Sequence, residues 1–326
     1  MSVLSDSKVS LTHVPVLARD VPAALIGNRD GIYVDATFGR GGHTRLLLNA
    51  LSPQARLFAF DRDKEAVAFA KNVVDPRFTM IASPFSRMKE VLSSCGIEKV
   101  DGILMDLGIS SPQIDDPSRG FSFRADGPLD MRMDQGTGPT ASEWLMASDE
   151  SRIQTVLREY GEERYAKAIT KAILKAQEAG PIRTTGALAR LVEKTIPRSL
   201  RDGAQHPATR TFQAIRIAVN DEFGELRCAL NAAGSLLNPN GRLVVIAFHS
   251  LEDRIVKRFF ASGLHPQVDS RLVLPECDLP RPLWRTCKRI LPGREEIQEN
   301  IRSRSAVLRM GTRTDEPWRE GESYAL

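Results

Sequence analysis

Short apolar runs divide much of the chain at regular intervals. Four begin about 22 to 24 residues apart, with helix-like segments such as 63–74 between most of them. A fifth apolar run follows much further along the chain. The five runs cover residues 31–38, 55–63, 77–85, 100–108 and 241–250, and each ends in polar residues or glycine. Nearly continuous apolar strands that alternate with helices are typical of a parallel sheet covered on both faces. The pattern therefore predicts a doubly wound α/β sheet.

This rhythm stops after residue 108. Residues 110–140 are rich in Gly, Pro, Asp and Ser and predict a long ordered loop. Helical patterns follow at 141–147, 149–161, 162–180 and 184–195, and a longer helical run covers 212–237. Two further strands are expected at 286–291 and 305–311. We therefore expect the sheet domain at 1–115 and 206–326, interrupted by an inserted all-α domain at 116–205.

Composition indicates a globular protein and limits the function classes. The 326 residues are 42% hydrophobic and 26% charged, which is ordinary for a soluble domain. The four cysteines form no C-x-x-C pair, so the sequence predicts neither a disulfide framework nor a metal centre. There is no signal-peptide pattern at the first residues and no run of eighteen apolar residues, so we expect a cytoplasmic protein with no membrane role.

Positive charge is concentrated in two segments. Residues 183–216 and 281–313 together contain sixteen basic and five acidic side chains, whereas the whole chain carries a net charge of only +4. These segments therefore hold +11 and the rest of the chain −7. Such asymmetry favours a polyanion bound on one face, including contacts from Arg198, Arg201, Arg302 and Arg304. The alternative is that the arginines only solvate helix surfaces.

The first expected strand runs into the segment FGRGGH, with Gly39, Gly41 and Gly42 between strand and helix. Open α/β sheets bind cofactors at this corner. The third glycine of the dinucleotide pattern G-x-G-x-x-G is missing here, so a dinucleotide is disfavoured. Asp61, at the end of the second strand, can accept the hydroxyls of a ribose. Asp35 would suit a cationic ligand such as S-adenosylmethionine; the alternative is that both aspartates only cap helices.

Several long motifs resemble one known family. They are HVPVL at 13–17, DATFGRGGH at 35–43, FDRD at 60–63, DLGISSPQID at 106–115, RGFSF at 119–123, GPLDMRM at 127–133, HPATRTFQAIRIAVN at 206–220, FHSLEDRIVK at 248–257 and RSRSAVLR at 302–309. The family that these segments resemble is the bacterial 16S rRNA (cytosine-N4)-methyltransferases of the MraW or RsmH type. The resemblance extends from about residue 10 to residue 313.

The resemblance implies a Rossmann-like class I methyltransferase that uses S-adenosylmethionine. Its substrate would be the exocyclic N4 of a P-site cytosine in 16S rRNA, within the small ribosomal subunit, and the insert would recognise RNA. The cofactor residues that it implies are Gly41, Gly42 and His43 for the methionine part, Asp61 for the ribose, Phe85 for the adenine, and Asp106 with Gln113 to complete the pocket. The sequence leaves open whether the chain acts alone or as a homodimer.

Asp106 ends the fourth expected strand and is the principal candidate for the reaction centre. Related amino-methylating enzymes place hydrogen-bond acceptors there for the amine of a flipped base. Here the acceptors would be Asp106 and oxygens around Ser110 and Ser111, although serines in such a loop also cap turns. His249 follows the fifth strand and, with Arg254 nearby, would contact the target nucleotide; the alternative is that His249 caps the following helix.

Two other functions remain open on the sequence alone. One is a nucleotide-dependent oxidoreductase, against which the missing glycine and Asp35 argue. The other is a non-catalytic ribosome-assembly factor on a methyltransferase fold, against which the complete glycine turn, Asp61 and Asp106 argue. Binding of NADH would support the first, and a measurement of methyl transfer would decide the second.

Overall fold

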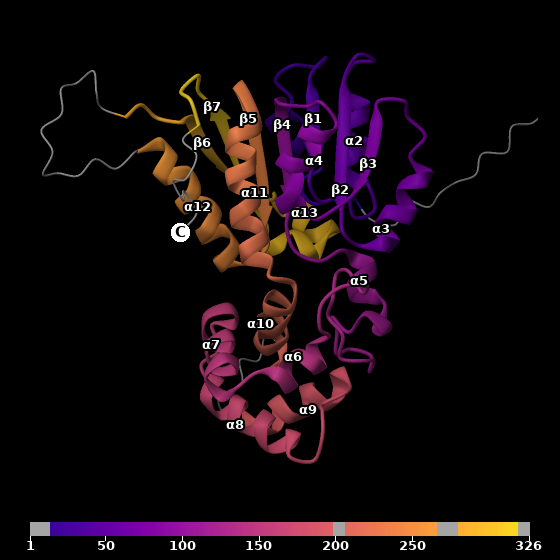
Figure 1. Ribbon diagram of the computed structural model, residues 1–326, viewed down its shortest axis with the longest axis vertical. Coiled ribbons are helices and arrows are strands. Elements are labelled where there is room, and N and C mark those ends of the chain that lie inside the picture. The colour runs from indigo at the N-terminus through magenta and orange to yellow at the C-terminus, as the bar shows by residue number, and fades with distance from the viewer. Residues whose placement is uncertain (1–13, 198–205, 266–279, 319–326) are drawn as a thin grey trace, which may run out of the picture.

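A seven-stranded sheet forms the centre of the computed structural model, which describes residues 14–197, 206–265 and 280–318 (Figure 1). Its strands are β1 (Ile32–Asp35), β2 (Arg56–Asp61), β3 (Phe78–Ala82), β4 (Val100–Asp106), β5 (Leu237–Ala247), β6 (Trp284–Ile290) and β7 (Val307–Arg313). They lie in the order β3-β2-β1-β4-β5-β7-β6. The strand order reverses between β1 and β4, and ligands of open α/β sheets bind at such a switch point.

Strand direction divides the sheet into two parts. β1 pairs in parallel with β2 and β4, and β2–β3 and β4–β5 are parallel as well. β7 runs antiparallel to β5, and β6 antiparallel to β7. Both late strands were expected from the sequence, although their direction was not. The polar edge strand β6, with its exposed arginines and lysine, closes this side of the sheet against further strand pairing.

Helices cover both faces of the sheet, which confirms the doubly wound α/β class (Figure 1). One apolar cluster joins the strands to α4, α11 and α12, and another joins them to α1 and α2 on the other face. The helices are α1 (Asp20–Leu25), α2 (Gly42–Ala50), α3 (Lys64–Phe69), α4 (Met88–Ser94), α5 (Ser111–Asp115), α11 (Glu222–Leu236), α12 (Ser250–Leu264) and α13 (Arg294–Glu299). Within the described ranges, no helix has the length and apolar character needed to cross a membrane.

The expected insert is helical and has an apolar core of its own. Its helices are α6 (Ala141–Ala147), α7 (Glu150–Gly161), α8 (Ala166–Gln177), α9 (Thr185–Thr195) and α10 (Thr209–Asn220). The expected boundary at 205/206 is wrong for α10, because its buried Phe212 and Ile215 pack in the core of the insert. The expectation of one helical run over 212–237 is also wrong: Asp221 adopts φ 47° and separates α10 from α11. We place the boundary there.

Buried polar contacts fix the insert to the carboxyl ends of the strands, where Figure 1 shows it. Arg119 is 2% exposed; it donates to Asp63 Oδ2 at 2.8 Å and to the carbonyl oxygen of Met133 at 2.9 Å. The side chain of Asn220 accepts from the Met133 N–H at 2.8 Å and donates to the Met131 carbonyl at 2.7 Å. Asp63, just after β2, is therefore connected through Arg119 and Met133 to Asn220, the last residue of α10, where the insert joins the sheet domain.

Candidate functional site

The glycine turn between β1 and α2 requires glycine for two separate reasons. Gly39 and Gly41 have φ angles of +54° and +68°, in the left-handed region that L side chains rarely adopt. A Cβ at Gly41 would also lie 2.8 Å from the ring of Phe38. Of the three glycines expected here, Gly39 and Gly42 line a cavity, whereas Gly41 is not among its described lining residues. What Gly41 contributes is therefore the left-handed conformation of the turn and its close approach to Phe38.

Replacing Gly41 with alanine should destabilise the protein by more than the same change at Gly96. Both positions are left-handed, with φ +68° and +73°, and each change should cost about 1 to 2 kcal/mol in backbone strain. No described atom lies within 4 Å of a Cβ at Gly96, so only Gly41→Ala must also displace an aromatic ring. Chemical denaturation of both variants measures the difference. Equal losses would mean that the Phe38 contact is harmless.

The cavity has a volume of about 910 Å³ and lies at the carboxyl ends of the parallel strands. This is at the upper end of the size range of small-molecule sites, roughly 300 to 1,000 Å³. The residues expected to bind cofactor or substrate that line it are Gly42, His43, Asp61, Phe85, Asp106, Ser111, Gln113 and His249. Residues from α2, the ends of β2 and β4, α5 and the start of α12 are thus brought together, as the sheet topology predicts.

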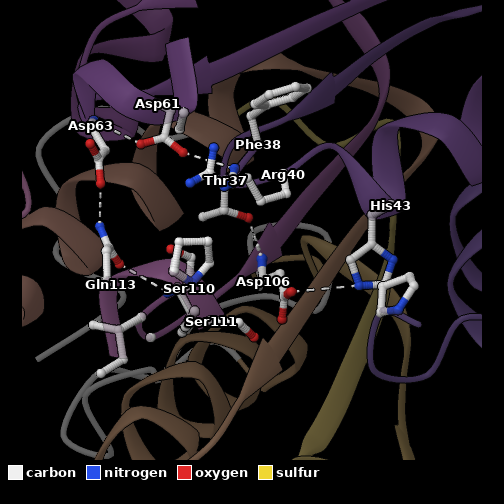
Figure 2. Close-up of a pocket in the computed structure, with 18 of the residues that line it drawn as sticks. Thr37, Phe38, Arg40, His43, Asp61, Asp63, Asp106, Ser110, Ser111 and Gln113 are labelled. Atoms are coloured by element: carbon white, nitrogen blue, oxygen red, sulfur yellow. Dashed lines mark hydrogen bonds and ion pairs between the residues drawn. The ribbon is translucent and has the colours of Figure 1, made fainter. Parts of the chain in front are cut away.

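Asp61, at the end of β2, faces the cavity and supports the glycine turn. Its two carboxylate oxygens accept the backbone N–H groups of Gly39 at 2.8 Å and Asp63 at 2.9 Å (Figure 2). Burial raises the pKa of Asp61, and these two hydrogen bonds oppose the shift. Each carboxylate oxygen retains a second lone pair, so the group can still accept hydroxyls from a ligand.

Gln113, on α5, holds the loop that follows β4. Its Nε2 donates to Asp63 Oδ2 at 2.7 Å, and its Oε1 accepts the N–H of Ser110 at 2.9 Å (Figure 2). The side chain is buried at the cavity wall. Phe85, in the 3₁₀ turn Phe85–Arg87 after β3, is partly buried and lines another part of the cavity. Gln113 therefore has its hydrogen bonds in the protein, whereas the ring of Phe85 remains available for stacking.

The buried His43 and the partly buried Asp106, whose side chain is 27% exposed, form a polar pair with unused hydrogen-bonding capacity. His43 Nε2 lies 3.5 Å from Asp106 Oδ2 (Figure 2). Neither ring nitrogen of His43, nor Asp106 Oδ1, finds a hydrogen-bond partner among the described residues. The backbone N–H of Asp106 donates to Thr37 Oγ1 at 2.7 Å, which fixes the end of β4 against the loop after β1. Unpaired buried polar atoms in a cavity are expected where a ligand completes them.

Burial shifts the two members of this pair in opposite directions. It raises the pKa of Asp106 to about 8, helped by the negative charges of Asp35 and Glu252. It lowers the pKa of His43 to about 4. Both groups are consequently neutral near pH 7 in the cofactor-free protein. A cation bound beside Asp106 would reverse its shift, because an opposite charge favours the ionised carboxylate.

We expect the cofactor-free protein to lose stability between pH 6.5 and 8, relative to the variant Asp106→Asn. A carboxyl whose pKa is raised on folding stabilises the fold at low pH, and that contribution disappears as pH rises through the folded pKa of about 8. His43 and Asp35, whose pKa values in the folded protein are about 4 and 6, are present in both proteins, so their own titration largely cancels in this comparison. The difference should reach up to about 2 kcal/mol. Denaturation of both proteins across this range measures it, and parallel curves would contradict the shift.

Asp35 does not act as the sequence suggested. Its carboxylate is 1% exposed and is not among the described residues of the cavity wall. It accepts from Thr44 Oγ1 at 2.6 Å and from the Thr37 N–H at 3.1 Å, and burial raises its pKa to about 6. The expectation that Asp35 faces a cationic ligand is therefore wrong. Its role is to hold the first turn of α2 against the end of β1.

His249 lines the cavity and also caps α12, so the capping role is confirmed and contact with the target nucleotide stays a prediction. Its Nδ1 accepts the Glu252 N–H at 3.4 Å, and its Nε2 lies 3.1 Å from Glu252 Oε1. Arg254 is half exposed, pairs with Glu162 at 3.2 Å and lies outside the described cavity wall. Arg216, on α10, lines the cavity instead and was not predicted as a site residue. The sequence offered two signals for Arg216: it ends the basic segment 183–216 and lies in the motif at 206–220.

The two ends of the described chain also contribute to the cavity. Val14 to Val16 line one side, next to Asn300 and Arg302. Asn300 Nδ2 donates to the Val14 carbonyl at 3.4 Å, and the Leu17 N–H donates to Glu296 Oε1 at 2.6 Å. Arg302 Nη1 donates to Ser111 Oγ, which is one of the predicted catalytic groups. Arg198 and Arg201, expected in the basic surface, lie outside the described residues.

Comparisons with known proteins agree on one family. The family model described as the MraW methylase family matches residues 10–314. A protein of Janthinobacterium sp. named "Ribosomal RNA small subunit methyltransferase H" is 53% identical over 313 residues, which cover 95% of this chain and 97% of the relative. A Burkholderia vietnamiensis protein of the same name is 50% identical over 308 residues, covering 93% and 98% of the two chains.

One of the solved structures that the chain matches resembles it only distantly. An rRNA methylase from Streptococcus thermophilus gives a TM-score of 0.38 at 12% identity, with 91% of this chain and 94% of that chain covered. A likeness of this size adds nothing to the fold seen here. The sequence relatives carry the assignment, because half of the residues are shared along nearly the whole length of both proteins. On that ground the chain belongs to the MraW methylase family.

Proposed function

We propose that this protein uses S-adenosylmethionine to methylate the exocyclic N4 of a P-site cytosine in 16S rRNA. The observation that carries the proposal is the unpaired Asp106 Oδ1 at the end of β4, in the cavity that Asp61 and the glycine turn also line. The substrate rests on the relatives named ribosomal RNA small subunit methyltransferase H. The cytosine and its N4 rest on the sequence resemblance.

The donor groups of the cavity fit this cofactor better than they fit a phosphate-bearing nucleotide. Asp61 and Asp106 both line the cavity, and burial already raises the pKa of each carboxyl; a pyrophosphate beside them would disfavour their ionised forms further, whereas a cation would favour these forms. A ribose, an ammonium and a sulfonium suit these carboxylates. Gly42 and His43 would hold the methionine part, Asp61 the ribose hydroxyls and Phe85 the adenine, while Gln113 keeps the wall in place. When bound, the cofactor would supply a methyl group on a positively charged sulfur.

Asp106 is the group that would act on the cytosine amine. The lone pair of this amine is conjugated with the ring, so an acceptor for its hydrogens helps the nitrogen to pyramidalise. Asp106 Oδ1 is free to accept one hydrogen and, after the N–C bond has formed, to take the proton that the nitrogen must release. Ser111 Oγ would offer a second acceptor at the start of α5, although Arg302 already donates to it. Holding the amine in the right position and orientation for transfer would supply most of the remaining rate enhancement.

The insert would hold rRNA near this cavity, within the small subunit. It joins the sheet at the carboxyl ends of the strands, where a flipped base must enter. Arg216 and His249 lie in the cavity wall between the two parts and would contact the target nucleotide. Arg254, which is paired with Glu162 outside the wall, is a weaker candidate than the sequence suggested.

Mass spectrometry of small-subunit rRNA tests this function directly. Cells without the protein should lose N4-methylcytidine at one P-site cytosine, while the other modified nucleotides remain. Purified protein with S-adenosylmethionine should restore the mark on small subunits from those cells. An intact mark in the deletion strain would refute the function. A lost mark that the purified protein fails to restore would favour a non-catalytic assembly factor.

A further inference from the structure

Arg302 reaches across the cavity from the end of the chain to the segment that follows β4. It lies in the 3₁₀ turn Ile301–Ser305, next to α13, and Figure 1 shows α13 at the same end of the sheet as α5. Its Nη1 donates to Ser111 Oγ, and its Nη2 donates to Asp115 Oδ1 at 3.1 Å. A guanidinium is thus held beside the first turn of α5, just after the strand that carries Asp106.

The ion pair that holds Arg302 is weak enough to exchange. The Arg302 side chain is 37% exposed and that of Asp115 is 57% exposed. Exposed pairs of this kind contribute little, because water screens both charges. The cavity wall offers other cations, but Arg216 is tied to Glu222 by two short hydrogen bonds at 2.7 and 2.8 Å with both groups largely buried. Arg62 donates to the carbonyl oxygen of Asn220, at the end of α10, where the insert joins the sheet domain.

The remaining cavity arginines lie on another side. Arg40 and Arg45 stack on the ring of Phe69, at 5.0 and 5.6 Å from its centre, between α2 and α3. Arg40 also lies 3.6 Å from Glu65. Arg302 is accordingly the cavity cation that combines contact with α5 and an exchangeable partner. A phosphodiester can accept two parallel hydrogen bonds from one guanidinium. The exposed carboxylate of Asp115 accepts only one, from Nη2 of Arg302.

We propose that Arg302 binds a backbone phosphate at the methylated nucleotide, and that Asp115 forms an ion pair with the Arg302 guanidinium until RNA binds. This inference rests on the proposed function, since it takes the polyanion to be rRNA. Asp115 then keeps the cation oriented in the free protein and is displaced by the phosphate. Arg302 acts as a positioning residue: it fixes the sugar-phosphate backbone next to α5, so that the base can reach Asp106.

Three variants separate a phosphate contact from a structural tie. Arg302→Gln removes the cation, and Asp115→Asn removes its competitor but keeps the shape. Arg304→Gln is the matched control, because Arg304 is an exposed arginine two residues along the same turn. For each protein, binding to unmethylated small subunits and single-turnover methylation are measured between about 50 and 200 mM salt. In this range the Debye length, over which exposed charges are screened, is on the order of 10 Å. Calorimetry with S-adenosylhomocysteine checks that the cofactor site is intact.

We expect Arg302→Gln to weaken subunit binding about ten- to a hundredfold and to reduce the salt slope by about 0.7 to 0.9. Asp115→Asn should leave binding unchanged or strengthen it, because a negative charge near the phosphate is gone. Arg304→Gln should have a smaller effect than Arg302→Gln. Affinity for S-adenosylhomocysteine should be the same in all four proteins.

Two results would overturn the inference. One is an unchanged salt slope in Arg302→Gln; the other is an equal loss of binding in Arg302→Gln and Asp115→Asn, which indicates a tie between two segments. The proposed function fails separately. If the wild-type protein binds subunits with a slope that depends on Arg302 but transfers no methyl group, the phosphate contact stands and the methylation proposal is wrong.

Discussion

Replacing Asp106 with asparagine should lower the single-turnover rate of methylation about ten- to a thousandfold, a loss of roughly 1.4 to 4 kcal/mol. Asparagine keeps the shape and one acceptor oxygen, but it can neither ionise nor take a proton. The amine hydrogens become more acidic as the N–C bond forms, so a carboxylate acceptor gains strength in the transition state. The opposing effect, attraction of the carboxylate to the sulfonium before transfer, should be smaller.

The chain offers a matched control for this variant. Asp101 lies on the same strand, β4, near its amino end, where it accepts the Ile32 N–H at 2.9 Å. Asp101→Asn makes the same chemical change away from the cavity and should leave the saturated rate unchanged. Both rates are measured at saturating cofactor and small subunits. A wild-type rate in Asp106→Asn would remove this residue from the chemical step and leave it, at most, a binding group.

Replacing Asp61 with alanine should weaken binding of S-adenosylmethionine by more than about a hundredfold while the fold remains intact. The carboxylate would accept two ribose hydroxyls, and hydrogen bonds to a charged group contribute about 1.5 to 3 kcal/mol each. The structure adds a second cause, because Asp61 also accepts the Gly39 N–H at 2.8 Å and so supports the glycine turn. Calorimetry at constant pH measures the affinity.

Asp61→Asn separates these two causes. It keeps one acceptor oxygen, so its affinity should lie between those of the wild type and Asp61→Ala. Circular dichroism and melting curves for each variant report whether the sheet domain is still folded. Unchanged affinity in folded Asp61→Ala would show that the ribose is bound elsewhere. Equal affinity in the two variants would indicate that support of the turn, rather than the ribose contact, is what the carboxylate provides.

Local pattern was sufficient for the sheet and for most of the cofactor corner. The apolar runs predicted the five strands β1 to β5, because buried parallel strands are nearly continuous in apolar residues. The antiparallel strands β6 and β7 were expected separately, from two short segments near the end of the chain. Asp61, Asp106 and Gly42 could be placed at one cavity from the sequence, since the carboxyl ends of parallel strands meet at one edge of the sheet. The break at Asp221 was missed because α10 and α11 keep apolar residues in similar steps on either side of it.

The sequence by itself determined the fold class, the family and the residue types at the cavity, because these depend on strand periodicity and on contiguous motifs. Only the tertiary structure decided which of the charged residues reach that cavity. Asp35 turned out to be buried beneath the turn, and Arg254 to lie outside the described wall, while Arg216 and Arg302 face the cavity. Arg302 is 191 residues from the Ser111 that it contacts. No local pattern encodes such a contact, because it depends on how the hairpin of β6 and β7 returns the chain to the sheet and on how α10 joins the insert to it.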